Sequence, residues 1–128
     1  MLDTFANPLV HLGGLGAGQA AKLLNNSLFT AQLGLAASAF SVARDLGVDV
    51  DALTKVLSNA SGRSYAAEVV AGSGHSLSVM AELAGPLLAK DVGILADLIG
   101  PGNPEVLQVA TTTINAMDLT DPAKTGTR

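Results

Sequence analysis

Apolar residues recur at helical intervals over a long segment in the first half of the chain. Between positions 24 and 46 they follow steps of three and four residues, which is the spacing of one face of an α-helix. This first stripe consists of Leu24, Leu28, Ala31, Leu35, Ala39, Val42 and Leu46. A second stripe on the same segment consists of Leu33, Ala36, Phe40 and Ala43. The pattern predicts a helix over residues 16–46 that is covered on more than one face.

Four shorter helices are predicted after the long one, and residues 77–83 could form a further short helix. The four cover residues 52–57, 64–71, 87–99 and 105–117. Gly47 is a natural end for the long helix, and Asp49 or Asp51 has a suitable side chain to cap the helix that follows. Pro86 suits the first turn of the third short helix, because proline is tolerated at that position. Asn103 is the expected cap of the last helix.

The two ends of the chain lack this helical period. Residues 8–12 predict a short extended segment, and the last residues predict a frayed tail. We therefore expect an all-α fold, a helical bundle around one long central helix, with a short extended N-terminal segment. The expected boundaries are residues 1–13 for that segment, 14–119 for the helical domain and 120–128 for the tail.

The composition favours one apolar domain that pairs with a partner. Of the 128 residues, 48% are hydrophobic and 14% are charged, so the chain is too apolar to be disordered. Because only 3% are aromatic, we expect a core of Leu, Val and Ala, which bury little area each. Small residues on the long helix favour close helix packing, namely Ala31, Gly34, Ser38 and Ala39. We expect a homodimer through this helix.

Charge and cysteine content argue against several other functions. The net charge is −4 and the basic residues are scattered, so no nucleic-acid partner is expected. The chain has no cysteine, and His11 and His75 lie far apart, so no metal site is expected. The uncharged stretch 23–43 has the length of a membrane span but holds seven polar side chains among 21 residues. We expect no membrane contact and, without a visible signal peptide, a cytoplasmic location.

The candidate chemistry lies in the segment His11-Leu-Gly-Gly-Leu-Gly-Ala-Gly-Gln-Ala-Ala-Lys-Leu-Leu-Asn-Asn26. Residues 16–21 have the G-x-G-x-x-A form of a dinucleotide-binding fingerprint. That fingerprint needs a second strand and an acidic residue about 20 positions on, whereas a helix of about 30 residues is predicted here. We therefore interpret the glycines as a tight turn that brings the backbone close to a ligand or another domain.

Lys22 and Asn26 are expected on one face of the long helix, because they lie one turn apart. A lysine that exchanges a proton near neutral pH needs surroundings that disfavour its ammonium form. Burial and the positive end of the helix dipole both act in that direction. Asn26 could then hydrogen-bond the amine or a bound hydroxyl. The pattern alone leaves open the alternative of a surface lysine beside a helix-capping network.

The segment from His11 to Asn26 resembles the inter-domain motif of the β-hydroxyacid dehydrogenases, in particular the 3-hydroxyisobutyrate and tartronate semialdehyde dehydrogenases. Three further segments fall in that family's order and spacing, namely Gly47–Asp49, Asn59–Ser64 and Leu88–Val92. The resemblance covers about residues 10–116. It implies a C-terminal helical domain of the 6-phosphogluconate dehydrogenase type. Residues 1–13 would then be the end of a preceding Rossmann domain.

The resemblance also implies an oxidoreductase activity and a set of site residues. The reaction would transfer a hydride between NAD or NADP and a small hydroxy acid substrate. By position, Lys22 matches the catalytic lysine that exchanges the hydroxyl proton. The implied substrate-binding residues are Asn26, Gly18 and Gln19, and the implied cofactor-binding residues are Lys90 and Asp91. Asp91 is expected to have an orienting or structural role.

Two functions are compatible with these observations. The first is the C-terminal half of an NAD(P)-dependent dehydrogenase, which is expected to be inactive alone and to bind no cofactor tightly without the Rossmann domain. The alternative is a non-catalytic helical module for dimerisation or interaction. The two functions differ at Lys22, because loss of this side chain would abolish activity in the first and change only stability in the second.

Overall fold

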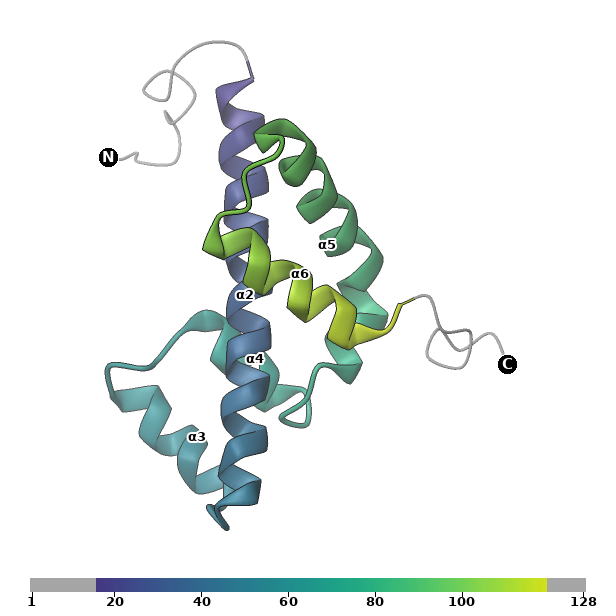
Figure 1. The fold of residues 1–128 in the computed structure, drawn as a ribbon. Helices are drawn as coiled ribbons and strands as arrows, with labels where there is room; N and C mark the ends of the chain where they lie inside the picture. The colour runs from purple at the N-terminus through teal and green to yellow at the C-terminus, as the bar shows by residue number, and fades with distance from the viewer. Residues whose placement is uncertain (1–15, 120–128) are drawn as a thin grey trace.

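The computed structural model describes residues 16–119, which form five helices and no strand. The helices are α2 (Ala17–Asp45), α3 (Val50–Asn59), α4 (Tyr65–Gly72), α5 (Ser78–Ile99) and α6 (Glu105–Met117). Figure 1 shows α2 as the central element, with α5 and α6 along one part of it and α3 and α4 near its C-terminal end. The predicted all-α class is confirmed. The extended segment predicted at 8–12 and the tail predicted at 120–128 lie outside the described residues.

The long helix begins and ends at glycines with positive φ angles. Gly16 has a φ of 93° and comes just before Ala17, the first residue of α2. Gly47 has a φ of 77°, and its N–H donates to the carbonyl oxygen of Arg44 at 3.0 Å. Other residues rarely adopt this left-handed conformation, so glycine is favoured at both ends. The helix predicted over 16–46 is confirmed to within one residue at each end.

Side-chain oxygens cap the two short helices that follow. The carboxylate of Asp49 accepts a hydrogen bond from the N–H of Ala52 at 3.3 Å, so Asp49 and not Asp51 caps α3. The hydroxyl of Ser64 accepts from the N–H of Ala67 at 2.9 Å and caps α4 in the same way. Each cap satisfies a backbone donor that the first helical turn leaves without a partner.

The largest departure from the predicted helices is at Pro86. The sequence predicts a new helix that begins there, whereas α5 runs without a break from Ser78 to Ile99 with Pro86 inside it. A proline in a helix interior removes one hydrogen bond and costs roughly 3 kcal/mol. The helix continues because Gly85 and Leu88, on either side of the exposed proline, are both buried. Tertiary packing therefore outweighs the local preference at this point.

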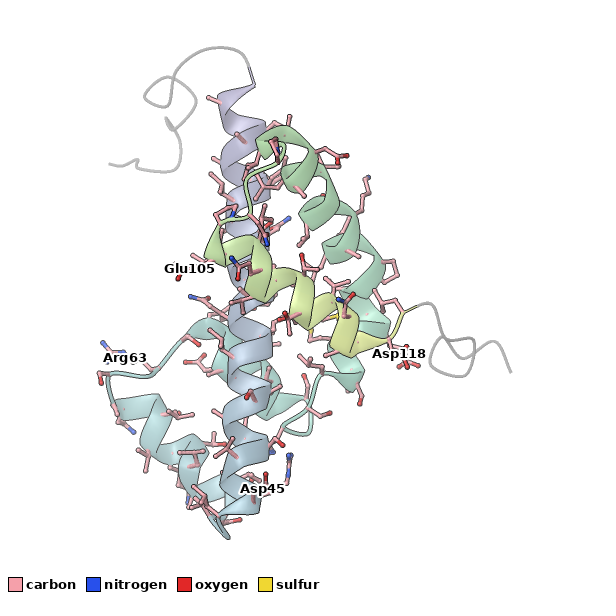
Figure 2. The ribbon with its side chains drawn as sticks, viewed as in Figure 1. Asp45, Arg63, Glu105 and Asp118 are labelled. Carbon is pink, nitrogen blue, oxygen red and sulfur yellow. The ribbon has the colours of Figure 1, made fainter. Side chains whose placement is uncertain are left out.

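The start of α6 also differs from the prediction, although its bounds do not. α6 covers Glu105–Met117 as predicted, but its N-cap is Pro104, which has no side-chain capping bond. Asn103 uses its backbone carbonyl oxygen instead, which accepts from the side-chain amide of Gln108 at 2.8 Å. Figure 2 shows Glu105 and Asp118 at the two ends of this helix.

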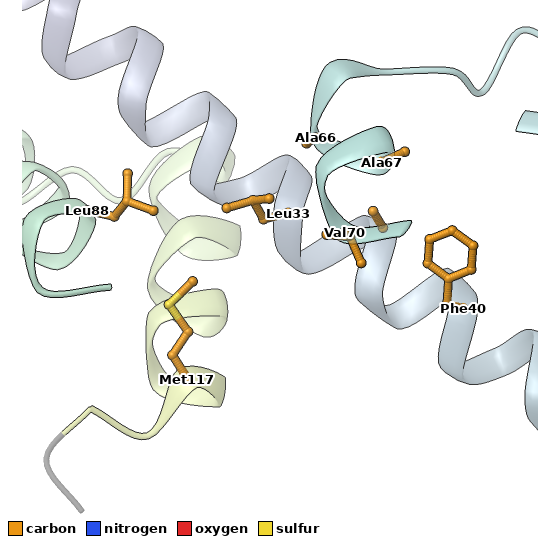
Figure 3. Packing of buried hydrophobic residues seen from close by; sticks show 8 residues of the cluster. Leu33, Phe40, Ala66, Ala67, Val70, Leu88 and Met117 are labelled. Atoms are coloured by element: carbon orange, nitrogen blue, oxygen red, sulfur yellow. The ribbon is translucent and has the colours of Figure 1, made fainter. Parts of the chain in front are cut away.

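Two apolar clusters form the core along α2. One contains Leu33, Ala36, Phe40, Ala66, Ala67, Val70, Leu88 and Met117, as Figure 3 shows. The other contains Leu23, Ala31, Val92, Leu95, Leu107 and Ala110. The second predicted stripe of α2 is therefore buried, as predicted. The first stripe is exposed except for Ala31, so the predicted coverage of this face is wrong within residues 16–119.

Two of the small residues assigned to a dimer contact pack inside the chain instead. A Cβ atom on Gly34 would lie 2.9 Å from the Cβ of Thr113 in α6, so Gly34 allows the close crossing of α2 and α6. Ala31 is buried against α5 and α6. Ser38 and Ala39 are exposed and remain available to a partner. None of the helices within residues 16–119 is both long and apolar enough to cross a membrane.

Candidate active site

The packing of α5 against α2 brings together two distant parts of the sequence. The side-chain amide of Asn26 on α2 donates to the carboxylate of Asp91 on α5, with 2.7 Å between Nδ2 and Oδ2. The two residues are 65 positions apart in the chain. Asp91 is only 4% exposed, and Asn26 is half-buried. Because a short hydrogen bond to a carboxylate is strong, it holds the Asn26 amide in one orientation.

This orientation turns the amide oxygen of Asn26 away from Asp91. The oxygen accepts a hydrogen bond from Nδ2 of Asn25 at 3.3 Å, at an exposed position on α2. The backbone carbonyl of Asn26 accepts from the hydroxyl of Thr30 at 2.8 Å. An amide oxygen has two lone pairs and an amide nitrogen two N–H groups, so the side chain still offers one acceptor and one donor. Asn26 can therefore bind a ligand hydroxyl while it is held by Asp91.

Lys22 lies one helical turn before Asn26, but its side chain is exposed. The expected burial of Lys22 is therefore wrong for the described part of the chain. The neighbouring residue Leu23 takes the buried position and is 0% exposed. Lys22 is in the second turn of α2, close to the positive end of the helix dipole.

The other predicted site residues lie near this pair without direct contact to it. Gly18, Lys22 and Asn26 follow one another at intervals of four along one face of α2. Gln19 in the first turn of α2 and Lys90 on α5 are both exposed. Among residues 16–119, neither forms a hydrogen bond with this set. The structure thus joins Asn26 to Asp91 directly, whereas the remaining predicted residues share only the helices α2 and α5 with this pair.

The arrangement suits proton exchange with a small hydroxylated ligand. The exposed amine of Lys22 and the amide of the half-buried Asn26 lie one helical turn apart. A hydroxyl group between them would meet an amine, which accepts a proton in its neutral form, and a hydrogen-bond partner, the two roles that general acid–base catalysis requires. The buried carboxylate behind Asn26 fixes the amide, so the geometry exists before a ligand arrives.

Sequence reasoning missed a second polar cluster, which surrounds His75. The hydroxyl of Thr54 donates to the carbonyl of Val50 at 2.8 Å and lies 3.0 Å from Nε2 of His75, with which it shares a hydrogen bond. Arg44 donates to the backbone carbonyl of His75 at 3.0 Å. These contacts tie the loop before α5 to α2 and α3. A single histidine in a glycine-rich loop gives no periodic signal, so the sequence offered no means of finding this cluster.

Comparisons with known proteins point to one family. Residues 16–121 match the family described as "NAD-binding of NADP-dependent 3-hydroxyisobutyrate dehydrogenase". The chain is 38% identical over 66 residues to a probable 3-hydroxyisobutyrate dehydrogenase of Mycobacterium tuberculosis strain H37Rv, covering 52% of this chain and 22% of that protein. It is 30% identical over 104 residues to the mitochondrial 3-hydroxyisobutyrate dehydrogenase of Homo sapiens, and the match covers 76% of this chain and 31% of that protein. No solved structure matches the chain.

A more distant relative gives the widest coverage of these three. The mitochondrial 3-hydroxyisobutyrate dehydrogenase of Drosophila melanogaster is 27% identical over 110 residues, which cover 80% of this chain and 34% of that protein. The chain thus spans about a third or less of the length of these curated relatives. The family match runs through the whole of the described structure, including Lys22, Asn26 and Asp91. The chain belongs to the β-hydroxyacid dehydrogenase family.

Proposed function

We propose that the chain is the helical part of an NAD(P)-dependent dehydrogenase that oxidises 3-hydroxyisobutyrate or a similar small hydroxy acid. The hydrogen bond between Asn26 and Asp91 supports this function most directly. It joins the segment in which the family resemblance puts the substrate contacts to the segment in which it puts the cofactor contacts. The matched relatives are named as 3-hydroxyisobutyrate dehydrogenases.

Two side chains of α2 have separate roles at the substrate hydroxyl. Lys22 Nζ takes the hydroxyl proton when the alcohol is oxidised and returns it in the reverse direction. Asn26 holds the hydroxyl oxygen, and Asp91 is a positioning residue that holds Asn26 through the 2.7 Å hydrogen bond. Because the Asn26 amide is already held in place, substrate binding costs little conformational entropy at this side chain.

The first turn of α2 suits the carboxylate of a hydroxy acid. The first N–H groups of a helix have no partner within it, and Gly16 offers no side chain to cap them. The N–H groups of Gly18 and Gln19 belong to this turn, one turn before Lys22. Together with the positive end of the helix dipole, they favour an anion at this point. The proposed site therefore calls for a substrate with both a carboxylate and a hydroxyl.

Lys90 fits a contact with a nicotinamide cofactor. Its ammonium is exposed on α5, next to Asp91, and its charge complements the phosphates of NAD or NADP. When bound, the cofactor takes the hydride from the substrate or gives it back. The described residues contain no strand from which a dinucleotide-binding sheet could be built. The other cofactor contacts therefore come from a second domain.

The experiment joins the chain to a dinucleotide-binding domain. The chain is fused behind the nucleotide-binding half of the mycobacterial relative, and oxidation of 3-hydroxyisobutyrate is followed by nicotinamide absorbance. We expect turnover by the fusion, none by the isolated chain, and a loss of about 10²–10⁴-fold in kcat for Lys22→Ala. Lys55→Ala, an exposed lysine on α3, is the matched control and should leave kcat unchanged. Full activity of a folded Lys22→Ala fusion would exclude the proposed role.

A further inference from the structure

A hollow of about 490 Å³ lies between the C-terminal half of α2, the start of α5 and the end of α6. Figure 1 shows these three segments close together. Arg44, on the α2 wall, comes 22 residues after Lys22, or about 33 Å along the helix axis. Small-molecule sites have volumes of about 300–1,000 Å³. The hollow is therefore large enough for a small ligand, and it is separate from the candidate active site.

The α2 wall of the hollow carries the positive charge of Arg44. Nη2 of this residue donates to the backbone carbonyl of His75 at 3.0 Å, which holds the guanidinium beside the hollow. A guanidinium has five N–H donors in one plane, and this bond uses one of them. The plane matches the two oxygens of a carboxylate, so Arg44 is suited to bind a ligand that carries one.

Two serines, just before and at the start of α5, add hydroxyl groups to the hollow. The hydroxyl of Ser76 donates to that of Ser78 at 3.3 Å and accepts from the backbone N–H of Ser78 at 3.3 Å. Within residues 16–119 the hydroxyl proton of Ser78 has no acceptor, so it can donate to a ligand. A carboxylate in the hollow would thus meet a second donor besides the guanidinium.

The opposite charge comes from Glu82, which lies one helical turn after Ser78 on α5 and lines the same hollow. In the described part of the chain, the only ion pair is between His75 and Asp51, so Glu82 and Arg44 are not joined to each other. An anion alone would be opposed by the Glu82 carboxylate, and a cation alone by the guanidinium. A ligand that carries a carboxylate and an ammonium would pair with both.

Apolar side chains from all three segments also line the hollow. Met117 on α6 is 4% exposed, and Leu77, just before α5, is partly buried. The thioether of methionine adapts to ligand groups of varied shape. An aliphatic group on the ligand would be removed from water against these side chains, which favours binding.

We propose that this hollow binds a free α-amino acid with an aliphatic side chain. Its carboxylate pairs with Arg44 and Ser78, and its ammonium pairs with Glu82. Its side chain packs against Leu77 and Met117. Only a free amino acid has both charges on one carbon, because each end of a peptide carries one of them. The site does not rest on the proposed dehydrogenase function, and the chain alone is sufficient to test it.

The probe is leucine, which has both charges and a branched aliphatic side chain. Isothermal titration calorimetry of the 128-residue chain should show one leucine bound per chain. N-acetylleucine lacks the ammonium and leucinamide lacks the carboxylate, so each should bind more weakly by about 10-fold or more. These two compounds also resemble the ends of a peptide, so they distinguish a free amino acid from a peptide ligand.

Two variants test the charged partners. Arg44→Gln and Glu82→Gln should each lower the affinity for leucine by about 10-fold or more. Arg63→Gln is the matched control for Arg44, since Arg63 is also exposed and donates to one backbone carbonyl, that of Ala60, at 3.2 Å. Glu105→Gln is the control for Glu82, since Glu105 is exposed in the first turn of α6. Figure 2 labels both control residues, which do not line the hollow and should bind leucine normally when changed.

Three results would overturn the site. The first is an absence of both binding heat and any rise in Tm at about 10 mM leucine, because a ligand that binds the folded state must stabilise it. The second is N-acetylleucine or leucinamide binding as tightly as leucine. The third is Arg44→Gln binding leucine as tightly as Arg63→Gln. Circular dichroism of the variants shows that their helices are intact, so a loss of binding cannot be attributed to unfolding.

Discussion

The carboxylate of Asp91 is buried where α5 meets α2, with the amide of Asn26 at 2.7 Å. Moving a carboxylate out of water is costly unless hydrogen bonds replace those it had with the solvent. Asn26 supplies one of them, so the two residues depend on each other for stability. The same contact holds the Asn26 amide for the substrate, which makes one interaction serve both the fold and the proposed chemistry.

This dependence predicts a measurable coupling between the two side chains. Asn26→Ala should lower the free energy of unfolding by about 1.5–3 kcal/mol, because it leaves a buried carboxylate without its donor. In a double-mutant cycle with Asp91→Ala, the coupling energy should lie in the same range of about 1.5–3 kcal/mol. Urea unfolding of the four proteins gives this value.

The neighbouring asparagine provides the control for that cycle. Asn25 is exposed and contacts the outer oxygen of Asn26, not Asp91. The cycle of Asn25→Ala with Asp91→Ala should therefore give a coupling within about 0.5 kcal/mol of zero. Equal coupling energies in the two cycles would show that the hydrogen bond between Asn26 and Asp91 contributes nothing specific.

The sequence predicted part of this site and missed the rest for physical reasons. Helical spacing placed Lys22 and Asn26 on one face, because side chains four apart on a helix are neighbours. No local pattern reports a contact across 65 residues, and only the family resemblance joined Asp91 to the site. The prediction that Lys22 is buried was wrong. It rested on the uncharged sequence that follows Lys22, and such a sequence does not determine which face of a helix another helix covers.

At the level of elements, the crossing of α2 and α6 depends on Gly34. Glycine in a helix interior is less favourable than alanine by about 1 kcal/mol, so its presence needs a compensating contact. The side chain of Thr113 occupies the space that a Cβ atom on Gly34 would need. The hydroxyl of Thr113 donates to the carbonyl of Val109 at 2.9 Å, which holds that side chain in place. The close approach of α2 and α6 therefore requires a glycine at position 34.

A pair of glycine substitutions separates helix propensity from packing. Gly34→Ala should lower the free energy of unfolding by about 1–3 kcal/mol, because the added methyl group meets Thr113. Gly93→Ala on α5 is the matched control, since nothing lies within 4 Å of the Cβ position there. It should raise the free energy of unfolding by up to about 1 kcal/mol. Thermal denaturation measures both, and stabilisation by Gly34→Ala would contradict the close crossing.

The helices themselves differed in how well the sequence predicted them. The ends of α2 and α6 followed from periodicity, with glycines that bound α2 and a proline before α6. The prediction was wrong at Pro86, because a local rule for helix starts gave way to the burial of residues on both sides of it. Periodicity also found two apolar stripes on α2 without distinguishing them. Which stripe is buried depends on where α4, α5 and α6 pack, and that information is not local.

Within the described residues, alanines make up a large share of the buried apolar residues, while many large apolar side chains are exposed. Six of the fifteen buried apolar residues in the described part are alanines, whereas Leu, Val and Ile dominate the exposed large residues. Hydrophobic stabilisation is proportional to the apolar area removed from water, so an alanine-rich core contributes little for its size. The large apolar side chains exposed along α2, namely Leu24, Leu28, Leu35, Val42 and Leu46, would add to that area on contact with a second copy of the chain. Folding should therefore be linked to the homodimer that the sequence leads us to expect.

This linkage predicts that the melting temperature depends on protein concentration. For a native dimer and an unfolded monomer, a rise of about 100-fold in concentration stabilises the folded state by roughly 2.7 kcal/mol per mole of dimer, or about 1.4 kcal/mol per chain. For a chain of this size, that corresponds to an increase in Tm of roughly 4–6 °C. Calorimetry over such a range should show this increase for the wild type and for Leu98→Glu, a control at a side chain of α5 that is 65% exposed. Leu35→Glu puts a charge in the middle of the exposed apolar face of α2, so it should melt at a lower temperature that does not change with concentration. A concentration-independent Tm in the wild type would show that the chain folds without its partner.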